Sequence, residues 1–247
     1  MEIRICKDRY ELGASAAKFT AAAIREAIAE KGCARILLST GASQFDTLAS
    51  LIKEDVEWDK VEMFHLDEYV NLPETHGASF RKYLKEKFTT KVNLKAAYFV
   101  DGTDENRKAL GEKINESPID VGLIGIGENG HIAFNDPPAD FETEEPYIVV
   151  KLNDTCKKQQ VGEGWFATPD DVPTHAVSMS VKQIMKCKKI ISCVPYAVKA
   201  DAVYKTLSGE LSNLVPATML KTHPDFTLYI DHDSAAKLSV PVLWDVK

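Results

Sequence analysis

Segments that read as strands alternate with segments that read as helices along most of the chain, and this pattern most strongly limits the fold. Apolar residues recur at helical spacing from Leu12 to Ile28, and Gly32 follows as a stop signal. The apolar run at 35–38 then predicts a strand, and a glycine-containing turn joins it to the next helix. Such alternation is typical of a mostly parallel sheet with helices on both faces. The sequence therefore predicts an α/β fold.

The same alternation continues to residue 230. We expect further strands at 61–66, 96–100, 119–125, 188–194 and 226–230, with extended segments at 147–152 and 176–180. We expect further helices at 45–52, at 79–88, after a cap at Thr103, and at 198–207. No repeat or obvious linker interrupts the pattern, so residues 1–247 are predicted to form a single domain.

The charge balance argues against nucleic acid as a partner. Thirty Lys and Arg against 37 Asp and Glu give a formal net charge of −7, and neither sign forms a run of five or six residues. With 45% apolar residues, the chain can bury a sizeable core. If the ligand is an anion, helix N-termini and a few placed cations must attract it locally, because the overall field repels it.

The N-terminus and the cysteines indicate an intracellular protein. Residues 1–9 alternate charged with apolar side chains, unlike a signal peptide, and no stretch approaches the ~18 apolar residues of a membrane span. The five cysteines are widely spaced and form no CxxC pair, so neither a disulfide framework nor a zinc site is indicated. We therefore expect a cytoplasmic protein with reduced, mostly buried cysteines, no metal and no membrane partner.

The notable polar clusters share one place in the predicted sheet. Each follows a predicted strand, and they lie at 39–43, 67–69, 127–136 and 195–199. In open sheets of this kind, ligands bind beyond the carboxyl ends of the strands. We therefore expect the four clusters to converge on one crevice.

The loop at 125–130 satisfies the G-x-G-x-x-G pattern of dinucleotide sites. That fingerprint also needs a helix starting inside it, whereas Pro137 and Pro138 would stop such a helix within two turns. We therefore expect no dinucleotide cofactor, and interpret Gly127 and its neighbouring glycines as positions where backbone amides approach a small ligand.

The same loop presents His131, with Asn129 two residues before it and Asp136 five after. Histidine is the side chain best suited to moving protons near neutral pH, and a nearby carboxylate can orient its ring. The alternative is a structural histidine bonded to the loop backbone. The other polar clusters at the same sheet edge favour the catalytic interpretation.

Asp67 and Glu68 come directly after a buried strand that contains His65. A carboxyl group in this place is costly to desolvate unless it is paired or functional, and burial raises its affinity for protons, as a general base requires. The alternative is that Asp67 caps the following loop or pairs with a cation. We interpret His65 as a hydrogen-bonded core residue.

The turn after the strand at 35–38 is a candidate anion site. Its hydroxyls, its glycine and the unpaired amides of the following helix suit a phosphate; the residues are Ser39, Thr40, Gly41, Ala42 and Ser43. The alternative is that Ser43 only caps that helix. Lys199 supports an anion nearby, because a cation in the first turn of a helix, in a row of apolar residues, breaks two local rules that a bound anion would relieve.

These segments resemble, in order, the motifs of the glucosamine-6-phosphate deaminase (isomerase) family. The similarity covers residues 36–238. The Asp-Glu-Tyr and Gly-His-Ile-Ala-Phe-Asn segments are the most diagnostic, because the related 6-phosphogluconolactonases typically have Asp-Glu-Arg and a Gly-His followed by Thr-Ala-Ser. The matching stretches are Leu38-Ser-Thr-Gly41-Ala-Ser43, Phe64-His-Leu-Asp67-Glu68-Tyr69, Gly125-Ile-Gly127-Glu-Asn129-Gly130-His131-Ile-Ala-Phe-Asn135-Asp136-Pro137, Val172-Pro173-Thr174-His175-Ala176 and the turn that holds Lys199.

The resemblance implies a modified Rossmann-like α/β sandwich that converts glucosamine 6-phosphate and water into fructose 6-phosphate and ammonia without a redox cofactor. It implies that Asp67 is the base that moves a proton between C2 and C1, and that His131 is the acid/base that opens the sugar ring. Asn129 and Asp136 match the positions that flank and tune this histidine. Ser43 and Lys199 match phosphate contacts.

Three departures from the family pattern bear on the phosphate and the histidine. Asp136 stands where many relatives have glutamate, and Asn129 stands where some have aspartate. Gly164 stands where well-studied members have a phosphate-binding arginine. Lysine cannot copy the bidentate geometry of arginine, so either another cation substitutes or the substrate differs. The candidate cations, which the sequence does not rank, are Lys157, Lys158 and Arg81.

Two other functions fit parts of the same pattern. A sugar-lactone phosphate hydrolase would need a histidine to activate water but no departing amine. A non-catalytic sugar-phosphate sensor would keep the pocket without turnover, and the changes at Gly164 and Asp136 fit such a loss. Family members range from monomers to hexamers, so the sequence leaves open whether the chain forms a homo-oligomer. It also leaves open the stereochemistry of the sugar and any allosteric control.

Overall fold

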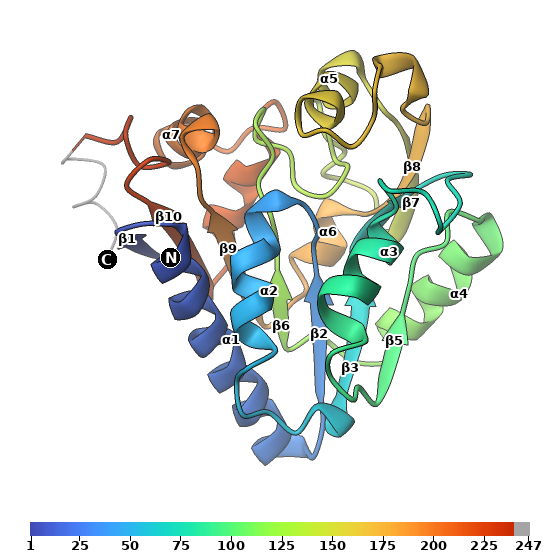
Figure 1. Ribbon diagram of the computed structural model, residues 1–247, viewed down its shortest axis with the longest axis vertical. Helices are drawn as coiled ribbons and strands as arrows, with labels where there is room; N and C mark the ends of the chain where they lie inside the picture. The colour runs from blue at the N-terminus through green and yellow to red at the C-terminus, as the bar shows by residue number, and fades with distance from the viewer. Residues whose placement is uncertain (240–247) are drawn as a thin grey trace.

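A seven-stranded parallel sheet forms the centre of the molecule (Figure 1). The structure, a computed structural model, describes residues 1–239. The predicted α/β class is confirmed, whereas the single domain over 1–247 stays a prediction because 240–247 lie outside the described residues. The strands, in order across the sheet, are β1 (Glu2–Cys6), β10 (Phe226–Asp231), β9 (Lys189–Val194), β6 (Val121–Leu123), β2 (Ala34–Leu38), β3 (Val61–His65) and β5 (Ala96–Tyr98).

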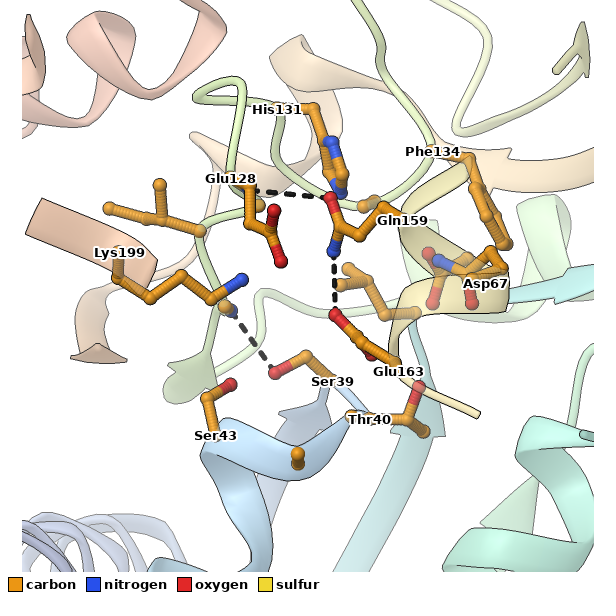
Figure 2. A pocket seen from close by; sticks show the side chains of 18 of the residues that line it. Ser39, Thr40, Ser43, Asp67, Glu128, His131, Phe134, Gln159, Glu163 and Lys199 are labelled. Carbon is orange, nitrogen blue, oxygen red and sulfur yellow. Dashed lines mark hydrogen bonds between the residues drawn. The ribbon is translucent and has the colours of Figure 1, made fainter. Parts of the chain in front are cut away.

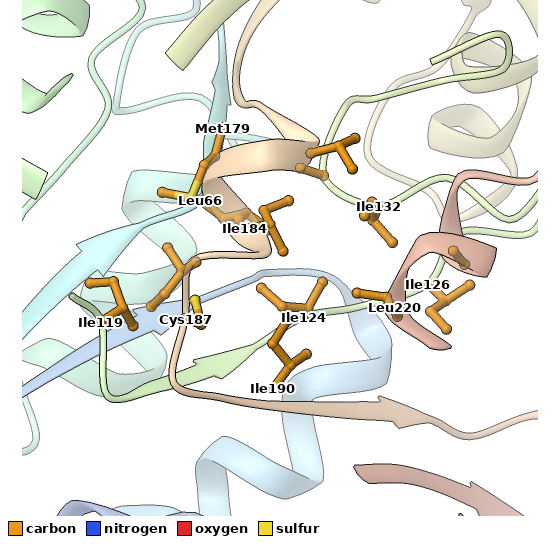
Figure 3. Packing of buried hydrophobic residues seen from close by; sticks show 14 of the residues in the cluster. Leu66, Ile119, Ile124, Ile126, Ile132, Met179, Ile184, Cys187, Ile190 and Leu220 are labelled. Atoms are coloured by element: carbon orange, nitrogen blue, oxygen red, sulfur yellow. The ribbon is translucent and has the colours of Figure 1, made fainter. Parts of the chain in front are cut away.

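Helices cover both faces of this sheet because side chains along each strand alternate in direction. Ile36 and Leu38 of β2 pack in the apolar layer under α1, α2 and α3, whereas Leu37 belongs to the layer under α4, α6 and α7. Figure 3 shows the second layer around Ile124 and Ile190. The helices are α1 (Arg9–Lys31), α2 (Phe45–Leu51), α3 (Phe80–Leu84), α4 (Asp104–Asn115), α5 (Asp154–Gly162), α6 (Val181–Ile184) and α7 (Ala200–Ser208).

Several helix ends follow from local sequence signals. Gly32 ends α1 with a left-handed φ of 78°, and its N–H donates to the carbonyl of Ile28. Thr103 caps α4 by accepting a hydrogen bond from the N–H of Asn106. Among residues 1–239, no helix is long and apolar enough to cross a membrane.

A second, three-stranded sheet packs beside the first and is antiparallel. Its strands are β4 (Asp67–Tyr69), β8 (His175–Met179) and β7 (Tyr147–Lys151). The strand expected at 61–66 is therefore found as β3, whereas the polar cluster that follows it forms the strand β4, which was not expected. Leu66 links the two sheets, since its N–H donates to the carbonyl of Leu38 and its own carbonyl accepts from the N–H of Met179.

The order of the strands favours a crevice between β2 and β6. From β2 the chain proceeds to β3 and β5 on one side, and β6 then returns to the other side of β2. Crevices form at such switch points because the connections leave the sheet in opposite directions. Other expected segments also differ in extent: the strands expected at 96–100 and 119–125 are confined to β5 and β6, the helix expected at 79–88 is α-helical only over α3, and the helix expected at 198–207 begins at Ala200.

Candidate active site

A pocket opens at the carboxyl ends of β2, β3, β6 and β9, where the four polar clusters meet (Figure 2). The expected convergence on one crevice is therefore found. The predicted site residues that line it are Ser39, Thr40, Gly41, Ala42, Ser43, Asp67, Gly127, His131 and Lys199.

Asp67 contributes a buried carboxyl group to one end of this pocket. Its side chain is directed into the pocket as the first residue of β4, and only 5% of the residue is exposed. Burial, with the negative charge of Glu68, raises the pKa of Asp67 to about 8. Among residues 1–239, no cation or hydrogen-bond donor lowers the pKa of Asp67 in turn. The alternatives that Asp67 caps the following loop or pairs with a cation therefore do not hold.

Glu68, the next residue, has a structural role instead. Its carboxylate accepts hydrogen bonds from the Ser79 hydroxyl at 2.8 Å and from the N–H groups of Phe80 and Arg81 at 3.2 and 2.8 Å. The Arg81 Nε lies 3.3 Å from the same carboxylate. Glu68 therefore fixes the start of α3 against β4, and this holds its neighbour Asp67 in place.

His131 is oriented by two side chains behind it. Its Nδ1 lies 2.7 Å from Asn129 Oδ1 and 3.2 Å from Asp136 Oδ1, and Asn129 Nδ2 donates to Asp136 Oδ1 at 3.1 Å. Both neighbours of Nδ1 are acceptors, so Nδ1 carries the hydrogen and Nε2 is left for a ligand. Asn129 and Asp136 do not line the pocket, and they act on it only through His131.

The Asp136 carboxylate remains ionised despite its burial. Desolvation would raise the pKa of Asp136, but the hydrogen bond and charge of His131 and the hydrogen bond from Asn129 outweigh it and lower that pKa. The shorter side chain at this position therefore still reaches His131.

The loop that carries His131 is fixed by its own backbone. The N–H of Gly127 donates to the carbonyl of His131 at 2.9 Å, and the side chain of Asn135 donates to the carbonyls of Ile132 and Met179. No helix starts inside the glycine pattern, in line with the rejected dinucleotide site. Asn135 thus connects the loop to β8 of the second sheet.

The turn after β2, residues 39–43, forms the wall of the pocket that faces the His131 loop. The Ser39 hydroxyl accepts a hydrogen bond from the N–H of Gly125 at 3.1 Å, which links this turn to the His131 loop. Gly41 adopts a φ of 100° that favours glycine, and its carbonyl accepts from the Tyr83 hydroxyl. Ser43 is not a helix cap, because α2 begins at Phe45 without a side-chain cap, and its hydroxyl instead accepts from Gln44 Nε2.

Lys199 precedes α7 as its N-cap residue and is 7% exposed. Burial lowers the pKa of Lys199, and the charges of Glu163 and Glu128 oppose that effect. Within residues 1–239 it is the only lysine or arginine that lines the pocket. None of the three candidate substitutes for the missing arginine lines the pocket, and Arg81 is paired with Glu68.

One wall of the pocket was missed from the sequence. Gln159 and Gln160 on α5, Glu163 just after it, and Glu128 in the His131 loop all line the pocket. Gln159 and Glu163 are four residues apart, which places them on one face of a helical turn. That spacing indicates a shared helix face, but no sequence signal places this face at the pocket.

His65 and the cysteines do not line the pocket. His65 is buried in β3, and neither ring nitrogen has a hydrogen-bond partner among the described residues, so the expected hydrogen bond is absent. Burial lowers the pKa of His65 to about 3, which keeps it neutral. All five cysteines are free and four are buried, as expected. No group of three or more potential metal ligands occurs within residues 1–239.

Comparisons with known proteins find curated relatives along most of the chain. A curated glucosamine-6-phosphate deaminase of Bacillus cereus (strain B4264) is 32% identical over 243 residues, covering 97% of this chain and 90% of that protein. One of Staphylococcus epidermidis (strain ATCC 12228) is 38% identical over 215 residues, covering 82% and 86%.

Solved structures share the fold. A monomeric glucosamine-6-phosphate deaminase is 29% identical with a TM-score of 0.86, covering 96% of this chain and 99% of that one. A 6-phosphogluconolactonase from Trypanosoma brucei has a TM-score of 0.78 at 17% identity, covering 96% and 98%, which shows the fold alone. The family model described as glucosamine-6-phosphate isomerases/6-phosphogluconolactonase matches residues 7–228, and the chain belongs to this family.

Proposed function

We propose that this protein converts glucosamine 6-phosphate and water into fructose 6-phosphate and ammonia. The observation that carries the proposal is that the Asp67 carboxyl and the His131 imidazole face one pocket, whose other wall holds Lys199 and the turn after β2. The curated relatives described above carry the name of this activity at 32–38% identity. The proposed partner is the small amino-sugar phosphate itself, and the proposed compartment is the cytoplasm.

The proposed chemistry begins with the closed sugar. The phosphate binds Lys199 and the hydroxyls and amides of the turn after β2, which fixes C1 and C2 at the other end. His131 Nε2 takes the proton from the C1 hydroxyl and returns it to the ring oxygen, which opens the ring. Asp67 then removes the proton on C2 and delivers it to C1, while the ammonium group on C2 loses a proton and the C1 oxygen gains one, so that C1 becomes a hydroxymethyl group. The resulting imine at C2 adds water and releases ammonia, leaving the ketone.

The raised pKa of Asp67 favours an amino sugar as the substrate. With a pKa of about 8, Asp67 is largely protonated at neutral pH, whereas a base must be ionised. An ammonium group on C2 would lie beside this carboxyl and would favour its charged form. A neutral lactone offers no such charge, so the same carboxyl would stay protonated in a lactone hydrolase.

Product analysis tests the proposal directly. Purified protein is mixed with glucosamine 6-phosphate, and ammonia and fructose 6-phosphate are measured together, with 6-phosphogluconolactone as a parallel substrate. We expect the two products in equal amounts and no lactone hydrolysis above the protein-free rate. Lactone opening without deamination would favour the hydrolase. Binding without any product, seen as a rise in Tm with added sugar phosphate, would favour the sensor.

A further inference from the structure

A carboxylate is held in the pocket wall by neutral donors only. Glu163 follows α5, and its Oε1 accepts a hydrogen bond from Gln159 Nε2 at 2.8 Å. Its Oε2 accepts from the indole Nε1 of Trp165 at 3.0 Å. Neither donor neutralises the charge, and no lysine, arginine or histidine within residues 1–239 forms an ion pair with it. The carboxylate is thus fixed in position with acceptor capacity left for a ligand.

The same network ties this carboxylate to the catalytic loop. Gln159 Oε1 accepts a hydrogen bond at 3.3 Å from the N–H of Glu128, three residues before His131 (Figure 2). Gln160, the next residue of α5, accepts at 2.6 Å from the hydroxyl of Tyr69 in β4. Helix α5 is therefore anchored to both elements that carry the reacting groups, and the position of Glu163 relative to them is defined.

Glu163 lies between the two ends of the pocket. Lys199 lies on one side of it and Asp67 on the other, and all three line the same pocket (Figure 2). A hexose 6-phosphate has its phosphate at one end and its reacting carbons, C1 and C2, at the other. The carbons between them carry hydroxyl groups, which donate hydrogen bonds. A carboxylate accepts hydrogen bonds and repels a phosphate, so the middle of such a sugar is the part that suits Glu163.

We propose that Glu163 is a specificity-determining residue that accepts hydrogen bonds from the sugar hydroxyls between the phosphate and the reacting carbons, those on C3 and C4. The inference rests on the proposed function for the class of substrate. It also assigns a role to the segment in which the family resemblance implies a phosphate-binding arginine. Gly164 supplies no side chain in this segment, and the neighbouring Glu163 carboxylate accepts hydrogen bonds from the sugar instead. A site that hydrogen-bonds a hydroxyl discriminates strongly against its loss or misplacement, because a buried polar group would be left unpaired.

Two variants separate the charge of Glu163 from its orientation. Glu163→Gln keeps the size of the side chain but replaces one acceptor oxygen with a donor. Trp165→Phe keeps an aromatic ring but removes the N–H that orients Oε2. The matched control is Glu105→Gln, on an exposed surface of α4 outside the pocket. Each protein is assayed with glucosamine 6-phosphate and galactosamine 6-phosphate, which differ only at C4, and its affinity for inorganic phosphate is measured by calorimetry.

We expect Glu163→Gln to reduce the ratio of kcat/KM between the two epimers at least tenfold, whichever epimer is preferred. Inorganic phosphate has no sugar hydroxyls, so its Kd should be unchanged or lower in this variant, because a repelling charge is gone. Trp165→Phe should give an intermediate epimer ratio, and Glu105→Gln should behave as the unmodified protein.

Other outcomes overturn the inference. If both epimers and inorganic phosphate bind more tightly to Glu163→Gln in parallel, Glu163 only opposes the charge of Lys199. If all three bind more weakly in parallel, Glu163 only supports the pocket wall. Glucitol 6-phosphate and galactitol 6-phosphate, used as ligands in a Tm assay, separate this inference from the proposed function. Discrimination between them that disappears in Glu163→Gln, without deamination by any protein, would keep the inference and retire the deaminase.

Discussion

The imidazole of His131 lies directly against the backbone of Gly127, so closely that a Cβ at position 127 would stand 2.1 Å from His131 Cε1 and 2.3 Å from Nε2. The glycine at this position is therefore required by the histidine ring itself. The sequence instead predicts a position where backbone amides approach a ligand. The lack of a side chain at position 127 leaves the space that the ring occupies, with Nδ1 on Asn129 and Nε2 left for a ligand.

Gly127→Ala is expected to reduce kcat at least 100-fold while leaving the fold intact. The methyl group would displace the His131 ring, because distances of 2.1–2.4 Å to three ring atoms cannot be tolerated. A shift of a catalytic group by about 1 Å typically costs about 100-fold in rate. Steady-state kinetics and Tm measure the two effects. Gly77→Ala is the control, since a Cβ there meets nothing within 4 Å. An active Gly127→Ala protein would show that His131 needs no such placement.

Much of the large sheet could be predicted from the sequence because its signals are local. Helical spacing and the Gly32 stop defined α1, and short apolar runs defined the buried strands. Strand β4 could not be predicted, because its three residues read as a polar cluster. They are extended because they pair with Ala176 to Ser178, more than a hundred residues later, and no local pattern encodes that pairing. The edge strand β1 was not predicted, because this short strand of five residues is mostly not buried and forms no apolar run.

The candidate site could be predicted only in part, because strand ends position some of its residues and tertiary contacts position the others. Asp67, His131 and Lys199 each follow a predicted strand of a mostly parallel sheet. Ligands bind beyond the carboxyl ends of such strands, so the convergence of these residues could be expected. The contribution of α5 could not, because this helix reaches the pocket through tertiary contacts: Gln160 with Tyr69, and Gln159 with the His131 loop. Its distance from any predicted strand end gave no reason to place it there.

Asp67→Asn is expected to lower kcat by about 100- to 10,000-fold, the range typical for loss of a general base. Its affinity for glucosamine 6-phosphate should change only a few-fold, because the phosphate contacts are at the other end of the pocket. Rapid-quench kinetics and solvent deuterium incorporation at C1 report the proton transfer, and calorimetry reports binding. Turnover close to that of the unmodified protein would exclude Asp67 as the base.

Glu68→Gln changes the carboxylate next to Asp67, to which we assign a structural role instead of a catalytic one. Glu68 is fully buried and accepts hydrogen bonds from Ser79 and Arg81, so removing its charge leaves the Arg81 guanidinium without its partner. We expect a loss of about 3–5 kcal/mol in the free energy of unfolding, as for other broken buried ion pairs. Urea denaturation measures it. A loss below about 1 kcal/mol would contradict the structural role assigned to Glu68.

The pH dependence of the free enzyme should report Asp67. Because its pKa is raised to about 8 and the base must be ionised, kcat/KM should increase with pH and level off above about 8. The corresponding pKa in the profile of kcat, which reports the substrate complex, should be lower, since the bound ammonium favours the carboxylate. Initial rates between pH 5 and 9.5 test both statements. A kcat/KM that is flat from pH 6 to 9 would contradict the assignment.

The same group links stability to pH. The pKa of Asp67 is raised on folding from 3.8 to about 8, so the folded protein holds this proton more tightly than the unfolded chain. Its contribution to stability is fully present below pH 4 and is lost as the pH rises through 8. Asp67→Asn stays neutral, so its Tm should match the unmodified protein near pH 4 and exceed it at pH 8.5 by at least about 2–4 °C, or ~1 kcal/mol. Equal Tm values at pH 8.5 would show that Asp67 is ionised without cost.

Lys199→Met tests whether one cation holds the phosphate. Within residues 1–239, Lys199 is the only lysine or arginine lining the pocket, and methionine keeps the length of its buried stem. A hydrogen bond to a charged group contributes about 1.5–3 kcal/mol, so KM for glucosamine 6-phosphate and Kd for inorganic phosphate should each rise about 10- to 100-fold. Lys158→Met is the matched control: Lys158 lies on α5 but outside the pocket, and its removal should change neither constant. If Lys158→Met weakens phosphate binding as much as Lys199→Met does, then α5 supplies a second cation when the substrate binds, and the missing arginine has a replacement after all.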